Sequence, residues 1–313
     1  MTSHRPVMLD EMLDWLEPKD DGVYIDGTFG AGGYSRAILR AADCHVFAID
    51  RDPSTKRFAE KLEQEFPDRF IWLLGNFCDM CSLVAMHGIR EADGIVLDLG
   101  VSSMQIDMAE RGFSFKQDGP LDMRMSQDGV SAADVINTAS ESELADIFYY
   151  YGEEKAARKI AHAITEARDA APITRTHQLA HIIRSILPGN KSTKTDPSTR
   201  SFQGLRIHVN HEFEAIESGL KAAEGLLAPG GRLIVVTFHS LEDRIVKRFT
   251  HSRCGKLGEH SRHLPERQVA ADVPSFFLPK PEKRIPSDEE IAANTRSRSA
   301  TMRMMTRHKE PAK

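Results

Sequence analysis

The chain has 313 residues, of which 28% are charged and 41% hydrophobic, and its net charge is −5. No apolar run reaches the roughly 18 residues that a membrane span needs, and four cysteines are too few for a disulfide scaffold. The composition therefore excludes a membrane-spanning protein and a disulfide-rich secreted domain, and its length allows one large domain or two smaller ones. Because the first residues also lack the apolar stretch of a secretory signal, we expect a cytoplasmic protein with no membrane partner.

The charge is spread unevenly along the chain. The acidic total argues against a protein that coats nucleic acid generically, yet from Arg244 onward Lys and Arg outnumber Asp and Glu by about two to one. A local basic surface can bind RNA even when the total charge is acidic. A solvated basic tail is the alternative.

The first structural unit is a strand, a glycine-rich turn and a helix. Residues 6–16 have helical spacing and precede an apolar strand, 23–26, that ends in Asp26. The turn at 27–33 leads into a helix that opens at Tyr34. Its glycines fall as G-x-G-G and not as the G-x-G-x-x-G of dinucleotide enzymes. Asp26 would repel a pyrophosphate and suits a ligand with an amino group and a positive charge, such as S-adenosylmethionine. A turn without a ligand is the alternative.

The next two strands lead to further candidate ligand contacts. Residues 44–50 form a buried strand that ends in Asp50, about 20 residues beyond the glycine turn, where these folds place an acceptor for ribose hydroxyls. The alternative is that Asp50 caps the segment that opens at Pro53. Residues 70–74 form a third strand, and Phe77 follows it. Phe77 either stacks on an adenine or serves as a core aromatic.

The fourth strand, 94–100, contains the acid that we expect to act in catalysis, Asp98. Because the carboxyl ends of parallel strands meet at one edge, Asp26, Asp50 and Asp98 should lie close together. An exocyclic amine such as cytosine N4 is a poor nucleophile, since its lone pair is delocalised into the ring. A carboxylate that accepts its N–H bond draws the lone pair out of conjugation. Asp98 is the predicted acceptor, and the transfer then depends mainly on positioning.

The middle of the chain changes to a helical pattern. Residues 101–128 are loop-like, 131–187 are helical throughout, and 188–197 form a basic loop. A single helix is predicted over 202–227, and a buried strand over 232–238 resumes the α/β alternation.

We therefore predict a helical domain inserted into an α/β domain. The expected fold class is a Rossmann-like sheet of the class I SAM-dependent methyltransferase type, discontinuous over 1–105 and 206–313. The all-helical insertion at 106–205 would recognise the substrate.

His239 follows the strand at 232–238 and should lie on the same edge as the three acids. It could orient the substrate base or take the released proton. The alternative is a structural histidine or a helix cap. Ser240 is the expected N-cap of the following helix, with Asp243 completing a capping box.

The remaining polar clusters are ambiguous or weak. Arg296 and Arg298 could contact phosphates or belong to a solvated tail, and 299–305 could form a final strand. We expect no metal site, because Cys78-x-x-Cys81 has no second pair at proper spacing. Cys254, His260 and His263 likewise lack the spacing of a zinc site.

Together these motifs resemble the bacterial 16S rRNA cytosine-N4 methyltransferase family, which acts on a cytidine at the ribosomal decoding site. The matching motifs run in the family's order over nearly the whole chain. They are His4 with Pro6-Val7, 24–33 (YIDGTFGAGG), 97–103 (LDLGVSS), 110–115 (ERGFSF), 118–125 (DGPLDMRM), 151–154 (YGEE), 199–203 (TRSFQ), 238–244 (FHSLEDR) and 296–300 (RSRSA).

The resemblance implies a set of residues that contact S-adenosylmethionine. They are Gly32, Gly33, Tyr34, Asp50, Phe77, Asp98 and Gln105. Tyr34 and Gln105 are additions that rest on the resemblance alone. The sequence departs from the family at Tyr34, where a histidine is common, and at Thr295, where a proline is common. The resemblance also implies that the inserted domain helps to hold RNA and that the protein is cytoplasmic.

Our hypothesis from the sequence is an enzyme that transfers a methyl group from S-adenosylmethionine to cytosine N4 in the 16S rRNA of the small ribosomal subunit. Two alternatives stay open: a SAM-dependent methyltransferase with another substrate, and an assembly factor that binds SAM and RNA without catalysis. A homodimer is compatible with the sequence, which does not fix the oligomeric state.

Overall fold

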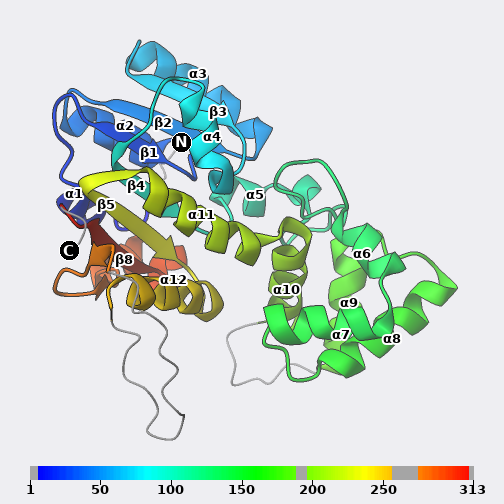
Figure 1. The fold of residues 1–313 in the computed structure, drawn as a ribbon. Coiled ribbons are helices and arrows are strands. Elements are labelled where there is room, and N and C mark those ends of the chain that lie inside the picture. The colour runs from blue at the N-terminus through cyan, green and yellow to red at the C-terminus, as the bar shows by residue number, and fades with distance from the viewer. Residues whose placement is uncertain (1–5, 188–195, 256–273, 310–313) are drawn as a thin grey trace, which may run out of the picture. The chain divides into compact units, whose positions relative to one another are not determined.

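The computed structural model describes residues 6–187, 196–255 and 274–309 (Figure 1). The chain divides into two compact units, one of residues 1–100 with 213–313 and one of residues 101–212. The second unit thus begins earlier and ends later than the insertion that the sequence predicts at 106–205. Of the predicted basic loop at 188–197, only the last two residues lie within the described part of the chain.

The first unit is built on one sheet with the strand order β3-β2-β1-β4-β5-β8-β6, and β7 also pairs with β8. The five strands from β3 to β5 are parallel, and β8 is antiparallel to β5. This is the Rossmann-like α/β sheet that the sequence predicts. The strands are β1 (Val23–Asp26), β2 (His45–Asp50), β3 (Phe70–Leu74), β4 (Ala92–Asp98), β5 (Leu227–Thr237), β6 (Phe276–Phe277), β7 (Lys283–Arg284) and β8 (Thr301–Arg307).

The central strands of the sheet are buried on both faces, and their successive side chains enter two different cores. In β4, for example, Ile95 and Leu97 point into one core and Val96 into the other, as the period of two in a strand requires. Side chains from α1, α2 and α3 fill the Val96 core, and those from α4, α11 and α12 fill the other. The helices of this unit are α1 (Leu9–Leu16), α2 (Gly33–Ala41), α3 (Lys56–Glu65), α4 (Met80–Ala85), α11 (Glu212–Leu226), α12 (Ser240–Arg253) and α13 (Asp288–Ala293).

The second unit is helical, apart from one isolated bridge between Pro120 and Arg175. It has a separate apolar core, which includes Phe148 and Leu205. The approach of α10 to the end of η4 needs glycine, because a Cβ on Gly204 would lie 2.9 Å from the backbone nitrogen of Gly152. Its helices are α5 (Ser103–Asp107), α6 (Ala132–Thr138), α7 (Glu141–Asp146), the π-helix η4 (Ile147–Tyr151), α8 (Ala157–Ala170), α9 (Thr176–Ile186) and α10 (Thr199–Asn210), with the 3-10 turn η3 (Ala109–Arg111).

Three local predictions from the sequence are wrong. The helix expected over 202–227 is two helices, α10 and α11, because His211 between them has left-handed backbone angles (φ 49°, ψ 44°). The segment 101–128 contains α5, whose capping box joins Ser102 and Gln105. The third is the solvated-tail alternative for the segment near Arg298, which forms an ordered 3-10 turn, η5 (Thr295–Ser299), that leads through Ala300 into β8, the final strand expected near 299–305; its contact with phosphates stays a prediction.

The antiparallel strand β8 is joined to α12 by a bidentate ion pair. Arg303 donates from Nε to Asp243 Oδ1 at 2.7 Å and from Nη2 to Oδ2 at 2.9 Å. The Arg303 side chain is only 6% exposed, so its charge depends on this partner. The pair ties the last strand of the sheet to the helix that follows β5.

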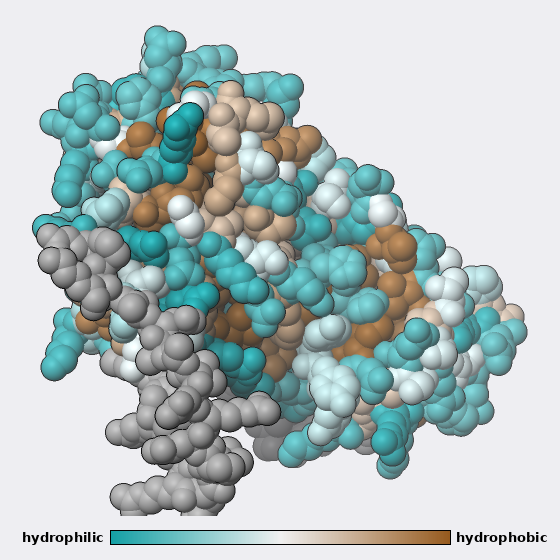
Figure 2. Space-filling view, viewed as in Figure 1, coloured by the Kyte–Doolittle hydropathy of each residue, from teal (hydrophilic) through white to brown (hydrophobic). Residues whose placement is uncertain are grey.

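No helix in the described part of the chain is long and apolar enough to cross a membrane. Figure 2 shows that hydrophilic side chains cover most of one face, with smaller hydrophobic areas between them. Apolar atoms contribute a large part of the surface of any folded protein, so small areas of this kind are ordinary.

We expect Asp243→Ala to lower the free energy of unfolding by about 3 kcal/mol, because it leaves a buried guanidinium without its carboxylate. The control is Glu65→Ala, which breaks exposed ion pairs to Arg36 and Arg40 and should cost less than about 1 kcal/mol. Urea unfolding followed by circular dichroism measures both. Equal losses in the two variants would contradict the role given to the Arg303 pair.

Candidate active site

Three acids end three adjacent strands at one edge of the sheet. Asp26, Asp50 and Asp98 are the last residues of β1, β2 and β4, and β1 lies between the other two strands. Because these strands are parallel, their carboxyl ends share the edge at which open α/β sheets bind ligands. The three acids nevertheless have different surroundings, which give them different roles.

Asp26 is an internal support of the glycine turn. Its side chain accepts hydrogen bonds from Ser35 Oγ (2.7 Å) and from the Thr28 amide (3.2 Å), and the residue is 1% exposed. Burial raises its pKa, and the hydrogen bond from Ser35 is the largest opposing influence. The carboxylate thus joins the end of β1 to the turn and to α2, and its expected contact with a ligand stays a prediction.

The turn needs glycine at two positions, because a side chain there would collide with packed neighbours. Gly32 has a φ of +78°, and a Cβ there would lie 2.7 Å from the Phe29 ring. A Cβ on Gly33 would lie 2.1 Å from Pro6 Cγ, so the absent side chain makes room for the N-terminal segment. Tyr34 is buried and donates its hydroxyl hydrogen bond to the Val7 carbonyl. Only the backbone of Tyr34 is therefore left for a ligand.

Asp50 is held in place by backbone groups while its side chain remains at the edge. Its Oδ2 accepts from the Gly30 amide at 2.7 Å, and Oδ1 accepts from the Asp52 amide at 2.8 Å. Burial raises the pKa of Asp50 to about 6. The cap of the following turn is Asp52, which accepts from the Ser54 amide, so the alternative that Asp50 serves as this cap is wrong.

Asp98 has the most unusual environment of the three acids. Its Oδ1 is buried and has no hydrogen-bond partner among the described residues, while its amide donates to Thr28 Oγ1 at 2.6 Å. Burial raises the pKa of Asp98 to about 8, with smaller contributions from the nearby carboxyl groups of Asp26 and Glu242. An unsatisfied buried oxygen is costly, and an edge where ligands bind is the place to expect such a cost.

His239 is the N-cap of α12 and faces Glu242 with both ring nitrogens. Nδ1 accepts from the Glu242 amide at 3.4 Å, and Nε2 lies 3.0 Å from Glu242 Oε1. The second contact has the distance of an ion pair but not the angles of a hydrogen bond. The predicted capping by Ser240 with Asp243 is therefore wrong. The arrangement favours the helix-cap alternative for His239. A direct role of His239 in proton transfer stays a prediction.

Glu242 is the residue of this edge that sequence reasoning missed. It is fully buried, and its Oε2 accepts from the amides of Phe238 (2.8 Å) and His239 (3.3 Å). The sequence signal for it is the capping spacing His239-x-x-Glu242, which is weak because histidine is an uncommon N-cap. Thr28, which links the glycine turn to Asp98, was also missed.

The last two predicted contacts lie in different places. Phe77 begins the turn η2 (Phe77–Asp79), is partly buried, and would touch a Cβ placed on Gly219 at 2.4 Å. It therefore packs against α11, and stacking on an adenine stays a prediction. Gln105 belongs to the compact unit 101–212, where its Oε1 accepts from the Ser102 amide at 3.0 Å. Its contact with a cofactor likewise stays a prediction.

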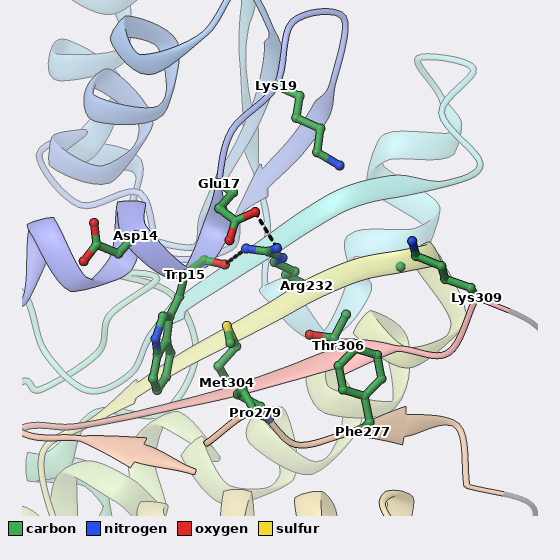
Figure 3. Close-up of a pocket in the computed structure, with 11 residues that line it drawn as sticks. Asp14, Trp15, Glu17, Lys19, Arg232, Phe277, Pro279, Met304, Thr306 and Lys309 are labelled. Carbon is green, nitrogen blue, oxygen red and sulfur yellow. Dashed lines mark hydrogen bonds and ion pairs between the residues drawn. The ribbon is translucent and has the colours of Figure 1, made fainter. Parts of the chain in front are cut away.

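A cavity of about 360 Å³ opens at the opposite edge of the sheet (Figure 3). Arg232 crosses it, donating to the Trp15 carbonyl and to Glu17 Oε2. Arg232 pairs in register with Gly94, near the start of β4, whereas Asp98 is at the end of that strand. The cavity is thus separate from the acid edge. Within residues 6–187, 196–255 and 274–309, no three His, Cys, Asp or Glu side chains are grouped as a metal site requires, and His260 and His263 lie outside these ranges.

Comparisons with known proteins give a consistent result. The model of the MraW methylase family matches residues 1–308. A relative from Rhodospirillum rubrum, named ribosomal RNA small subunit methyltransferase H, is 54% identical over 315 residues, covering 100% of this chain and 96% of the relative. A protein of the same name from Paramagnetospirillum magneticum is 52% identical over 309 residues, covering 99% and 97% of the two chains.

The solved structures are more distant. An rRNA methylase from Streptococcus thermophilus has 10% sequence identity and a TM-score of 0.43, with 98% of this chain and 99% of that chain covered. A likeness of this degree supports no conclusion about this chain.

We expect the free energy of unfolding of Asp98→Asn to exceed that of the wild type by a margin that grows as pH rises from about 4 to about 8. The unfolded carboxyl ionises near its usual pKa of about 4, whereas the folded carboxyl keeps its proton up to about pH 8. The folded state therefore binds more protons in this window, and wild-type stability falls as pH rises. The amide does not titrate, and since one unit of pKa shift corresponds to about 1.4 kcal/mol, the gain between pH 4 and pH 8 should be on the order of 4 kcal/mol.

Urea unfolding at pH 4.5 and pH 8 measures this difference. Asp93→Asn, an exposed change in the same strand, is the control. If the difference between Asp98→Asn and the wild type is the same at both pH values, the raised pKa of Asp98 is contradicted.

Proposed function

The chain belongs to the MraW methylase family, and we propose that it transfers a methyl group from S-adenosylmethionine to the exocyclic N4 of a decoding-site cytidine in small-subunit ribosomal RNA. The Asp98 carboxyl carries this proposal, because one of its buried oxygens lacks a partner among the described residues at the edge where the ligands of such folds bind. The names of the relatives support ribosomal RNA of the small subunit as the substrate. Action on this RNA would place the enzyme in the cytoplasm.

The fold is that of class I SAM-dependent methyltransferases, as the sequence predicts. The carboxyl edge fits this cofactor, because Gly30 and Gly32 give the turn left-handed angles and the N-terminus of α2, which has no side-chain cap, follows it directly. Asp50 is fixed by two amides and can accept hydrogen bonds from ribose hydroxyls. When bound, the cofactor supplies an electrophilic methyl group and a positive charge that favours the ionised form of Asp98.

Asp98 would act on the cytosine amine. The Oδ1 atom is the acceptor that an N4–H bond can satisfy, and its hydrogen bond draws the nitrogen lone pair out of the ring. The bound cofactor would supply the methyl group to N4 and would keep on its sulfur the electron pair of the carbon–sulfur bond that breaks. The surplus N4 proton passes to the Asp98 carboxylate, whose raised pKa of about 8 favours taking it.

Glu242 and Thr28 would position Asp98 without contacting the substrate. Thr28 Oγ1 holds the Asp98 amide, and Glu242 fixes the backbone at Phe238 and His239, where β5 leads into α12. A pair of cytidine and guanosine buries N4 in the duplex, so the target nucleotide must be unpaired or extruded. The helical unit 101–212 would help to hold the RNA, and the expected contact of Gln105 with the cofactor stays a prediction. A homodimer remains a prediction.

We expect Asp50→Ala to weaken S-adenosylmethionine binding by about 10-fold or more, since a hydrogen bond to a charged group contributes about 1.5–3 kcal/mol. Isothermal titration calorimetry measures the dissociation constant. The control is Asp43→Ala, because the Asp43 side chain is 82% exposed. Unchanged affinity in Asp50→Ala would remove Asp50 from the cofactor site.

We expect Asp98→Ala to lower methyl transfer by about 10²-fold or more, because it removes the acceptor for the amine. Cells that carry only this variant should lack N4-methylcytidine in their small-subunit rRNA, as measured by nucleoside mass spectrometry. Asp93→Asn in the same strand should retain it. Undiminished N4-methylcytidine with Asp98→Ala would exclude the proposed role, and rescue of a deletion strain by that inactive variant would favour an assembly factor.

A further inference from the structure

The exposed face of α12 has a cluster of three cations. Arg244, Lys247 and Arg248 are exposed and follow the spacing i, i+3 and i+4, which places them on one side of the helix. The opposite side is buried in the sheet core through Val246 and Thr250. We call these three residues the α12 basic face.

The basic face is not neutralised by the helix that carries it. The two acids of α12 are already used, since Glu242 is buried at its N-terminus and Asp243 is paired with Arg303. In the described part of the chain, Lys247 and Arg248 form no ion pair or hydrogen bond.

The neighbouring basic residues of α12 provide a contrast. Arg253 donates to Glu224 at 2.8 Å, and His251 lies 3.8 Å from Glu282. Lys247 and Arg248 have no such acidic partner among the described residues, so an anionic ligand can pair with both.

The position of the face relates it to the candidate active site. Helix α12 starts directly after His239, at the edge where β5 ends, and Glu242 in its first turn raises the pKa of Asp98. With a rise of 1.5 Å per residue, Lys247 and Arg248 lie about 8 Å further along the helix axis. A chain bound there would reach the edge within a few nucleotides.

A second cationic element ends at the same edge. In the register of β8 with β5, Thr301 pairs with Thr237, the last residue of β5. The turn η5 directly precedes Thr301, and its Arg298 is exposed. Two separate segments of the chain therefore bring exposed cations to the edge that holds Asp98.

We propose that the α12 basic face binds the phosphate backbone of the RNA next to the target cytidine. The inference rests on the proposed function, because it takes the RNA substrate from there and adds the surface that holds it. Lys and Arg side chains bind phosphates without reading sequence, so the face would position the strand and would not select the base.

The test compares Lys247→Ala/Arg248→Ala with Lys56→Ala/Lys61→Ala, a matched pair of exposed lysines on α3. Binding to the small ribosomal subunit is measured between about 50 and 200 mM salt. The α12 variant should bind about 10-fold or more weakly at the lower salt. Its plot of log affinity against log salt should be less steep by about 0.7 for each phosphate that the variant no longer neutralises. The α3 variant should match the wild type.

Two further measurements separate positioning from folding and from chemistry. The α12 variant should bind S-adenosylmethionine like the wild type and should show a raised KM for the subunit with an unchanged kcat. Lys247→Arg/Arg248→Lys, which keeps both charges, should retain most of the affinity.

The outcomes distinguish this inference from the proposed function. Wild-type affinity and salt dependence in the α12 variant would overturn the inference alone, provided that the wild type methylates the subunit. If the wild type forms no N4-methylcytidine in the subunit, the proposed function fails, and the assignment of this RNA to the face fails with it. A loss of S-adenosylmethionine binding together with RNA binding in the α12 variant would indicate a structural role and would also overturn the inference.

Discussion

The parallel arrangement of β1, β2 and β4 is the constraint on which the site depends, because it forces three strand-end carboxylates to one edge. The surroundings then give each acid a separate function. Asp26 is satisfied by Ser35 and Thr28, Asp50 is oriented by two amides, and one oxygen of Asp98 is left without a partner among the described residues. The acid whose side chain is least satisfied by the protein is therefore the one best suited to receive a substrate proton.

The C-terminal part of the chain completes this edge. Strand β5 brings Phe238 and His239 beside the end of β4, and Glu242 then fixes their amides at the start of α12. The pair between Arg303 and Asp243 connects α12 to β8 across 60 positions of the sequence. The environment that raises the pKa of Asp98 thus depends on segments far from it in the chain.

Much of the fold could be predicted from the sequence because its signals are local. Buried strands that end in acids and a G-x-G-G turn are visible in any window that contains them. The roles that were missed or misplaced depend on distant partners. Gly33 makes room for Pro6, and Tyr34 bonds to Val7. The helix break at His211 could not be predicted, because no glycine or proline marks it in the sequence.

An acid-rich edge creates an electrostatic problem for an enzyme that acts on RNA. The chemistry needs carboxyl groups near the target amine, yet these groups and a net charge of −5 repel a polyanion. At physiological salt the interactions of exposed charges are largely screened beyond about 8 Å, so distant surface cations compensate only weakly. Compensation must be local, and α12 can provide it because it begins with Glu242 at the edge and exposes Lys247 and Arg248 between one and two turns later. One helix can then support the carboxylate that accepts the proton and hold the strand that presents the amine.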